Sequence, residues 1–234
     1  MRIAVVGSGI AGLATAWLLS EQHQVTLFEA NDYAGGHTHT VDVTLQGRHC
    51  GVDTGFLVFN EVTYPNLVPM LRHLGVPVAP SEMTFSLALE SPAIEWSGSN
   101  LDTLFAQRRN LLRPSFLRML RDVLRFNREA PRLLHSGAGE LPLGEFLAAG
   151  GYGRAFVEQY IVPMGAAIWS VPVRLMLEFP ARSFVQFFHN HGLLEVFDRP
   201  RWRTVSGGSR EYLKRLLAQA NPVLRLAAEV VDIR

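Results

Sequence analysis

The amino-acid sequence predicts an α/β fold in which a strand–helix–strand unit opens the chain and a long, mainly helical region follows. Residues 2–6 form an apolar run of strand length, and residues 13–19 repeat apolar side chains at helical spacing. A second apolar run covers residues 25–28, and a glycine turn at residues 207–208 precedes another helical pattern. We therefore expect a first domain at 1–75, a helical region at 76–200 and a return to the first domain at 201–234.

Composition is typical of a globular protein with a sizeable core, since 48% of the 234 residues are hydrophobic and 18% are charged. The net charge of +1 gives no electrostatic reason to expect nucleic-acid binding. The single cysteine, Cys50, fits a reducing compartment. We expect no signal peptide, and we expect no membrane span because the longest uncharged stretch, 159–173, is short and contains two prolines. We therefore expect a cytoplasmic protein.

The first turn is a glycine motif that fits the pyrophosphate of a dinucleotide. Gly7 allows a tight turn, Gly9 lets a phosphate approach the backbone, and Gly12 lets the helix pack close to the strand. The candidate residues in this motif are Gly7, Ser8, Gly9, Ile10, Ala11 and Gly12. The first helical turn presents free N–H groups and the positive end of the helix dipole. Glu29 and the adjoining Ala30 follow the second strand, where the carboxylate can accept hydrogen bonds from ribose hydroxyls.

The segment after Glu29 separates two classes of dinucleotide. A nicotinamide-binding domain would normally continue with another helix and strand. Here a second glycine turn at Gly35 and Gly36 follows at once, and then a predicted hairpin of strands at 40–45 and 49–53. This order favours a flavin dinucleotide.

The remaining elements are expected in chain order. Thr63 is the expected cap of a helix that runs to about Leu74 and is ended by Gly75. Pro163 is expected to interrupt a long helix. The further expected elements are strands at 85–89 and 93–96, helices at 101–107, 116–128, 144–149, 152–169, 180–189 and 210–219, and a closing strand at 228–234.

Together these motifs resemble the flavin-containing amine oxidase superfamily, which includes protoporphyrinogen oxidases, phytoene-type desaturases and polyunsaturated fatty-acid isomerases. Within it, the chain looks most like bacterial proteins encoded beside cyclopropane-fatty-acid synthases. The matching features are the first glycine motif with Glu29, the loop Gly35-Gly36-His37-Thr38, Asp53-Thr54-Gly55-Phe56, and Val205-Ser206-Gly207-Gly208 followed by Val230-x-x-Ile233.

The resemblance implies FAD as the cofactor and a ββα-type Rossmann-like fold with an inserted substrate region. It implies that Gly35, Gly36, His37 and Thr38 pass beneath the flavin or beside the diphosphate, and that the main chain of Val230 contacts adenine. Tyr33 and His37 replace arginines that are common in the family, so flavin contacts there are expected to differ. Similar proteins are longer and close with a Gly-Asp motif, so we expect an N-terminal portion that holds the adenine and pyrophosphate.

Other polar residues are weighed as candidate sites. His37 and His39 are two possible metal ligands, but a metal site usually needs three or four, and we assign no metal. His189 and His191 are interpreted as a surface pair at a helix end. Cys50 is interpreted as a small buried residue rather than a nucleophile.

The helix predicted from 116 to about 132 has two distinct faces. Its arginines, at 118, 121, 125, 128 and 132, recur every three or four residues, while Phe116, Leu120, Val123, Leu124 and Asn127 lie elsewhere on the helix. Such a helix can rest on an anionic membrane. The alternative is a solvated face whose charges pair with Asp122 and Glu129.

These observations predict a flavin-dependent oxidoreductase that transfers a hydride from an apolar, fatty-acyl or lipid-like substrate to flavin N5. No catalytic acid or base is assigned. Large apolar residues at 159–169 and at Phe184, Phe187 and Phe188 could line a substrate tunnel or form the core. The alternatives are a redox-neutral double-bond isomerase on the same fold, an NAD(P)-dependent dehydrogenase, and a non-catalytic nucleotide-binding fragment.

Overall fold

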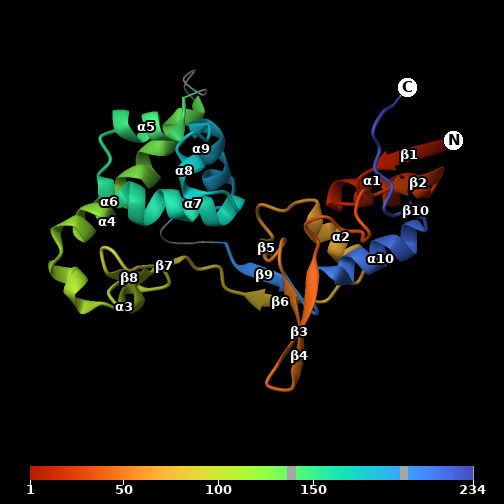
Figure 1. Ribbon diagram of the computed structural model, residues 1–234, viewed down its shortest axis with the longest axis horizontal. Helices are drawn as coiled ribbons and strands as arrows, with labels where there is room; N and C mark the ends of the chain where they lie inside the picture. Colours follow the sequence, from red (N-terminus) through yellow and green to blue (C-terminus); the bar gives the residue numbers. More distant parts are fainter. Residues whose placement is uncertain (136–140, 196–199, 234) are drawn as a thin grey trace. The chain divides into compact units, whose positions relative to one another are not determined.

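The computed structural model describes residues 1–135, 141–195 and 200–233, which form two compact units (Figure 1). The first unit comprises Met1–Glu82 and Arg201–Arg234, and the second comprises Met83–Pro200. The first unit is a mixed α/β structure and the second is mostly helical. The predicted α/β fold class is therefore confirmed.

The first unit is built on a parallel sheet. Strands β1 (Arg2–Val6), β2 (Gln24–Phe28) and β10 (Val223–Arg225) are arranged in the order β1-β2-β10. Helix α1 (Ile10–Ser20) connects β1 to β2, as predicted. Leu13 and Ala16 of α1 are buried with Leu27 of β2 and with Tyr212 of helix α10 (Arg210–Ala220). This packing fixes the beginning of α1 at the carboxyl end of β1, where the glycine motif lies.

A two-stranded hairpin follows the second glycine turn, as predicted. Strands β3 (Thr40–Leu45) and β4 (Arg48–Asp53) pair antiparallel with Leu45 opposite Arg48. The two loop residues, Gln46 and Gly47, both have positive φ, at 50° and 76°. This geometry matches the right-handed twist of the flanking strands, which explains the tight turn.

A second, antiparallel sheet was not expected from the sequence. It contains β5 (Phe59–Asn60), β9 (Trp202–Val205) and β6 (Val78–Ser81) in the order β5-β9-β6. Helix α2 (Leu67–His73) lies between β5 and β6 in the chain and begins later than predicted. The amide oxygen of Asn60 accepts hydrogen bonds from the N–H groups of Val62 and Thr63, so Thr63 lies in a turn rather than at the helix cap. Gly75, at φ +63°, ends α2 as expected.

The predicted closing strand at 228–234 is wrong for its described part, since residues 226–233 form no strand; Arg234 lies outside the described residues. Strand β10 lies earlier, and Ala227 just after it has φ +48°, which interrupts the extended backbone. Val231 and Ile233 alternate with polar residues, as in a strand, but both side chains are exposed and pack against no core. The strand pattern was therefore present without a packing surface to stabilise it.

The second unit pairs a small hairpin with a group of helices. Strands β7 (Ser86–Leu89) and β8 (Ile94–Ser97) confirm the two predicted strands. The helical elements are α3 (Leu101–Leu104), η1 (Arg108–Leu112), α4 (Pro114–Glu129), η2 (Ala130–His135), α5 (Leu143–Ala149), α6 (Arg154–Phe156), η3 (Val157–Ile161), α7 (Val162–Trp169), α8 (Val173–Met176) and α9 (Ala181–Asn190).

The long predicted helix at 152–169 is divided by a π-helical segment, η3, immediately before α7. Pro163 has no N–H to donate to a carbonyl one turn earlier, so the regular helical bonding is already broken there. Phe184 and Phe188 of α9 are buried and stack with ring centroids 4.3 Å apart. These aromatic residues belong to the core of the second unit. Within the described residues, no helix combines the length and apolar character needed to cross a membrane.

Candidate dinucleotide site

The first glycine loop has the geometry that its motif predicts. Gly7 has φ +90° and donates its N–H to the carbonyl of Phe28 at 2.8 Å. A Cβ atom on Gly12 would lie 1.9 Å from the carbonyl oxygen of Gly7, so only glycine fits there. The helix and the loop are therefore in direct backbone contact, as the motif requires.

The beginning of α1 is open to a ligand. The first helical hydrogen bond runs from Leu13 N–H to the carbonyl of Gly9, so the N–H groups of Ile10, Ala11 and Gly12 precede it. No side chain caps this end of the helix. A Cβ atom on Gly9 would have no described atom within 4 Å. This space and these donors suit an anionic group such as a phosphate.

Ser8 connects the first loop to Glu29 and to the second loop. Its backbone N–H and its hydroxyl both donate to Oε2 of Glu29, at 2.9 and 2.5 Å. The hydroxyl oxygen of Ser8 also accepts the N–H of Gly35 at 3.0 Å. Ser8 and Glu29 are both buried, so these bonds are shielded from water. One serine side chain therefore joins three separate segments of the site.

Glu29 is held as a carboxylate. Its Oε1 atom accepts two further hydrogen bonds, from the backbone N–H and the side-chain amide of Asn31, each at 2.9 Å. The bonds from Asn31 and Ser8 outweigh the effect of burial and lower the pKa of Glu29 from 4.5 to about 2. The side chain is thus ionised at neutral pH and can accept hydrogen bonds from hydroxyl donors.

The second glycine loop packs directly against the first. Gly36, at φ +55°, approaches so closely that a Cβ atom on it would lie 3.2 Å from the Cα of Gly9. Gly35, at φ +126°, has no room for a Cβ atom, which would lie 2.5 Å from the carbonyl oxygen of Thr38. The two predicted glycine turns therefore form one continuous backbone surface at the beginning of α1.

Thr38 and His37 anchor the second loop to neighbouring segments. The buried hydroxyl of Thr38 lies 2.5 Å from the hydroxyl of Tyr212 on α10. The carbonyl oxygen of His37 accepts the N–H of Phe56 at 2.9 Å. A Cβ atom on Gly55 would lie 2.3 Å from the same oxygen, which explains the glycine after Asp53 and Thr54. The segment Asp53-Thr54-Gly55-Phe56 thus contacts the backbone of the second loop at His37 and holds it in place.

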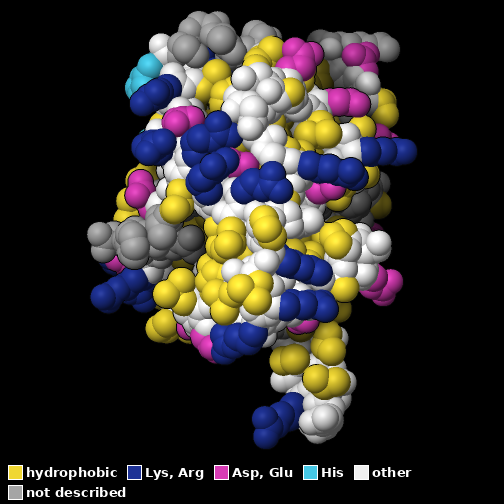
Figure 2. All heavy atoms as spheres, turned by 90° about the vertical axis from the view of Figure 1, so that its left-hand side faces the viewer, with side chains coloured by type: hydrophobic (Ala, Val, Ile, Leu, Met, Phe, Trp, Pro, Cys, Tyr) yellow, Lys and Arg dark blue, Asp and Glu magenta, His cyan; other side chains and the backbone are white. Residues whose placement is uncertain are grey.

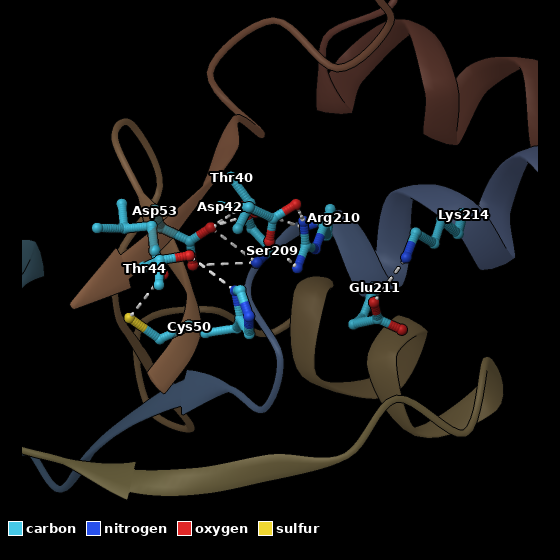
Figure 3. A network of polar contacts seen from close by, with 11 residues as sticks. Thr40, Asp42, Thr44, Cys50, Asp53, Ser209, Arg210, Glu211 and Lys214 are labelled. Carbon is cyan, nitrogen blue, oxygen red and sulfur yellow. Dashed lines mark hydrogen bonds and ion pairs between the residues drawn. The ribbon is translucent and has the colours of Figure 1, made fainter. Parts of the chain in front are cut away.

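Asp53 caps the beginning of α10 (Figure 3). Its carboxylate accepts the N–H of Ser209 at 2.9 and 3.0 Å, the hydroxyl of Ser209 at 2.8 Å and that of Thr40 at 2.5 Å. Arg210 bonds to Asp42 on the neighbouring strand at 2.6 and 2.7 Å. A carboxylate at a helix N-terminus is favoured by the helix dipole. The hairpin is thereby fixed to the helix that also holds Thr38.

Two candidate residues lie at the edge of this arrangement. Ala30 is exposed beside Glu29, and Val230 is partly buried beyond β10. The chain before Val230 runs along the end of β2, because Ala227 and Ala228 donate their N–H groups to the carbonyls of Asn31 and Glu29, each at 2.8 Å. Val230 follows this contact but is not part of a strand.

Three residues of the site were not predicted from the sequence, and the burial of Cys50 was predicted wrongly. Asn31, Tyr212 and Ser209 match no sequence motif. Tyr212 and Ser209 bond to residues 174 and 156 positions away in the chain, and Asn31 bonds back to Glu29, two residues before it. Asn31 is nevertheless of a residue type that often bonds to nearby backbone and side chains. Cys50 was interpreted as buried, but it is exposed on β4, because the hairpin faces solvent at this position.

This fold and site define a Rossmann-like dinucleotide-binding unit. Residues 5–74 match the model of the family described as "NAD(P)-binding Rossmann-like domain". Over this segment the chain is similar in sequence to proteins named as a carotenoid desaturase and a polyamine oxidase.

Two curated relatives illustrate this. Over 74 residues, 31% of this chain, the sequence is 52% identical to a 1-hydroxycarotenoid 3,4-desaturase of Flavobacterium sp. (strain P99-3). Over 76 residues, 32% of this chain, it is 42% identical to an Arabidopsis thaliana protein named as a polyamine oxidase. The matched segment spans only 14% of the length of either relative.

The fold is similar to that of a solved structure over nearly the whole chain. The cyclohexylamine oxidase of Brevibacterium oxydans IH-35A superposes with a TM-score of 0.67 at 20% identity. The superposition covers 97% of this chain and 51% of that one. The chain therefore spans about half the length of this structural relative.

Proposed function

We propose that the first unit of the chain is the dinucleotide-binding part of an FAD-dependent oxidoreductase that acts on an apolar, lipid-like substrate. The observation that carries this proposal is the contact between the two glycine loops, in which Gly36 packs against Gly9 at the open beginning of α1. The names of its relatives, which include desaturases and amine oxidases, support an oxidoreductase.

The pyrophosphate would lie on the N–H groups of Ile10, Ala11 and Gly12. The space beside Gly9 accommodates it, and the dipole of α1 favours its negative charge. The second loop extends this surface through Gly35 and Gly36, where a longer ligand would continue. The fingerprint of a nicotinamide-binding domain lies in a single glycine-rich turn, the first βα turn.

Glu29 would bind a ribose hydroxyl through its Oε1 atom. All four hydrogen bonds to the carboxylate come from protein groups, so one of them has to be exchanged. The side-chain amide of Asn31 is the group that can leave, because Asn31 is exposed while Ser8 is fully buried. The backbone bonds to Glu29 would then keep the carboxylate in position while the ribose binds.

The bound flavin would supply the redox chemistry by accepting a hydride. The residues of this chain would bind and orient the flavin. Asn31 and Ser8 would keep Glu29 ionised, so that its carboxylate could accept a hydrogen bond from the ribose. An apolar substrate is supported by the relative named as a hydroxycarotenoid desaturase, whose substrate class is hydrocarbon-rich.

The purified chain tests this proposal through its absorbance spectrum and through titrations with FAD, NAD and NADP. Retention of a yellow flavin, or tight FAD binding with weak binding of NAD and NADP, is the expected result. Tight binding of NAD or NADP alone would instead indicate a nicotinamide-dependent dehydrogenase. No binding of any dinucleotide would contradict the proposal. Bleaching of bound flavin by an apolar substrate without air would then test the oxidoreductase, and product without bleaching would indicate an isomerase.

A further inference from the structure

The second unit concentrates basic side chains in one segment. Residues 108–132 contain eight arginines but only two acidic residues, whereas the whole chain has a net charge of +1. The remaining residues are therefore negative overall. These arginines, at 108, 109, 113, 118, 121, 125, 128 and 132, lie on η1, α4 and η2 and the residue that joins η1 to α4.

Arg125 is partly buried, and its guanidinium group is held by other residues of the same unit. It donates hydrogen bonds to the carbonyls of Gly150 and Gly151, at 2.8 and 3.2 Å, and lies 4.1 Å from the ring centre of Tyr152. Asp122 pairs with it at 3.4 Å. The predicted stripe of five arginines is thus interrupted at its centre.

Other arginines of the segment remain available to a partner. Arg108 pairs with Asp102, and Arg128 pairs with Glu129. Arg118, Arg121 and Arg132 are exposed, and within the ranges that the structure describes none of them pairs with an acidic side chain. Their charges are therefore not neutralised by the described part of the protein.

Exposed leucines accompany these charges. Leu117 and Leu124 lie two turns apart on one face of α4, with Arg121 between them, and are 44% and 57% exposed. Leu111 and Leu112 end η1 just before α4, and Leu112 is 88% exposed. Figure 2 shows hydrophobic and basic side chains interleaved on one face of the molecule. Single exposed leucines are ordinary, but a set of four beside uncompensated arginines is a specific combination.

We propose that this surface docks on an anionic phospholipid membrane. The α4 surface, as we name it, consists of Leu111, Leu112, Leu117, Arg118, Arg121, Leu124 and Arg132. Arginines bind lipid phosphates, and leucines enter the boundary between headgroups and acyl chains. A nucleic acid would neutralise the arginines but leave the leucines in water. A neutral apolar partner would cover the leucines but remove the arginines from water without compensation. Of these three partners, the lipid surface satisfies both requirements, and this inference does not depend on the dinucleotide site.

Co-sedimentation of the full chain with lipid vesicles tests the inference. The chain is expected to bind vesicles of phosphatidylcholine mixed with phosphatidylglycerol, to release as salt is raised, and to leave pure phosphatidylcholine vesicles unbound. R118Q/R121Q should lower the partition coefficient about 25-fold, at about fivefold per charge. L117Q/L124Q should lower it about 100-fold, at about tenfold per leucine.

The control variant is L45Q/R48Q, which removes a leucine and an arginine that pair across the tip of the β3–β4 hairpin. It should bind anionic vesicles as the unmodified chain does, and circular dichroism should show the same helix content for all variants. Equal binding to neutral vesicles would overturn the proposal, as would equal loss in the control. Loss of binding on charge removal with no effect of L117Q/L124Q, together with competition by RNA, would assign the surface to a nucleic acid instead.

Discussion

Ser8 donates two hydrogen bonds, one from its backbone N–H and one from its hydroxyl, to a single carboxylate oxygen of Glu29. The same hydroxyl accepts the N–H of Gly35, so the serine between the first two glycines orders the second glycine loop as well as the first. Contacts within the protein therefore hold both loops in place, which lowers the entropy that ligand binding has to overcome.

Replacement of Ser8 by alanine should destabilise the chain by about 1–3 kcal/mol, because the N–H of Gly35 and one oxygen of Glu29 lose a buried partner. Urea unfolding followed by circular dichroism measures this change. Ser20→Ala is the matched control, since the hydroxyl of Ser20 makes one bond, to the carbonyl of Trp17 at 2.7 Å. Equal destabilisation by the two substitutions would contradict the bridging role of Ser8.

Glu29 should make stability depend on pH in the acid range. Its pKa is lowered in the folded state to about 2 from 4.5, so the folded state is stabilised above pH 4.5 and loses this stabilisation as pH falls toward 2. The loss should amount to about 1–2 kcal/mol once solvent screening is allowed for. Urea unfolding at pH 6 and pH 3 measures it. Glu29→Gln, which cannot titrate, should show a smaller difference between the two pH values. An unchanged difference would show that other carboxyl groups account for the whole dependence.

Replacement by alanine should impair ligand binding at Gly9 and fold stability at Gly12. Gly9→Ala should change the free energy of unfolding by no more than about 0.5 kcal/mol, because its added Cβ meets open space and its φ of −62° suits alanine. It should nevertheless weaken dinucleotide binding at least tenfold, because the methyl group occupies the phosphate position.

Gly12→Ala should instead destabilise the fold by about 3 kcal/mol or more, since its Cβ would clash with the backbone of Gly7. Unfolding and dinucleotide titration of both variants separate the two roles. Unaltered dinucleotide affinity in Gly9→Ala would place the phosphates elsewhere.

Asp53→Asn should weaken the connection between the β3–β4 hairpin and α10. The amide oxygen can keep the bonds that Oδ1 accepts, but the NH2 group would face the Ser209 N–H that donates to Oδ2, and the negative charge at the beginning of α10 would be lost, at a cost of about 2 kcal/mol. Asp42→Asn is the matched control, because Asp42 is an exposed partner of Arg210 and should cost less. Thermal unfolding of both variants checks this order, and a larger effect of Asp42→Asn would contradict it.

The first loop, the second loop and the hairpin were predictable because their signals are local. Glycines that require positive φ or close contact, such as Gly7 and Gly12, constrain the backbone wherever the chain folds. The hairpin turn at Gln46 and Gly47 is equally local.

Other features depended on contacts that no local pattern encodes. Strand β5 is two residues long and β6 contains Pro80, so neither shows a strand pattern until β9 pairs with both. Thr63 was the expected cap of α2, but its N–H donates to the side chain of Asn60, and Thr63 lies in a turn before the helix. The strand pattern at 228–233 found no neighbouring strand. Tyr212 meets Thr38 from 174 residues away, a distance in sequence over which spacing carries no information.

The pairing of β10 with β2 has a consequence for how the chain is made. On the ribosome, the first eighty residues emerge long before Tyr212 and the strand that begins at Val223, so the nucleotide-binding unit has to wait for its last elements. The intervening unit, Met83–Pro200, has its own core and can fold first. Once it has folded, fewer flexible residues separate β6 from β9 and β10, which shortens the loop that the late pairing must close. A substitution that slows folding of the inserted unit would therefore lower the yield of an intact nucleotide site without touching any of its residues.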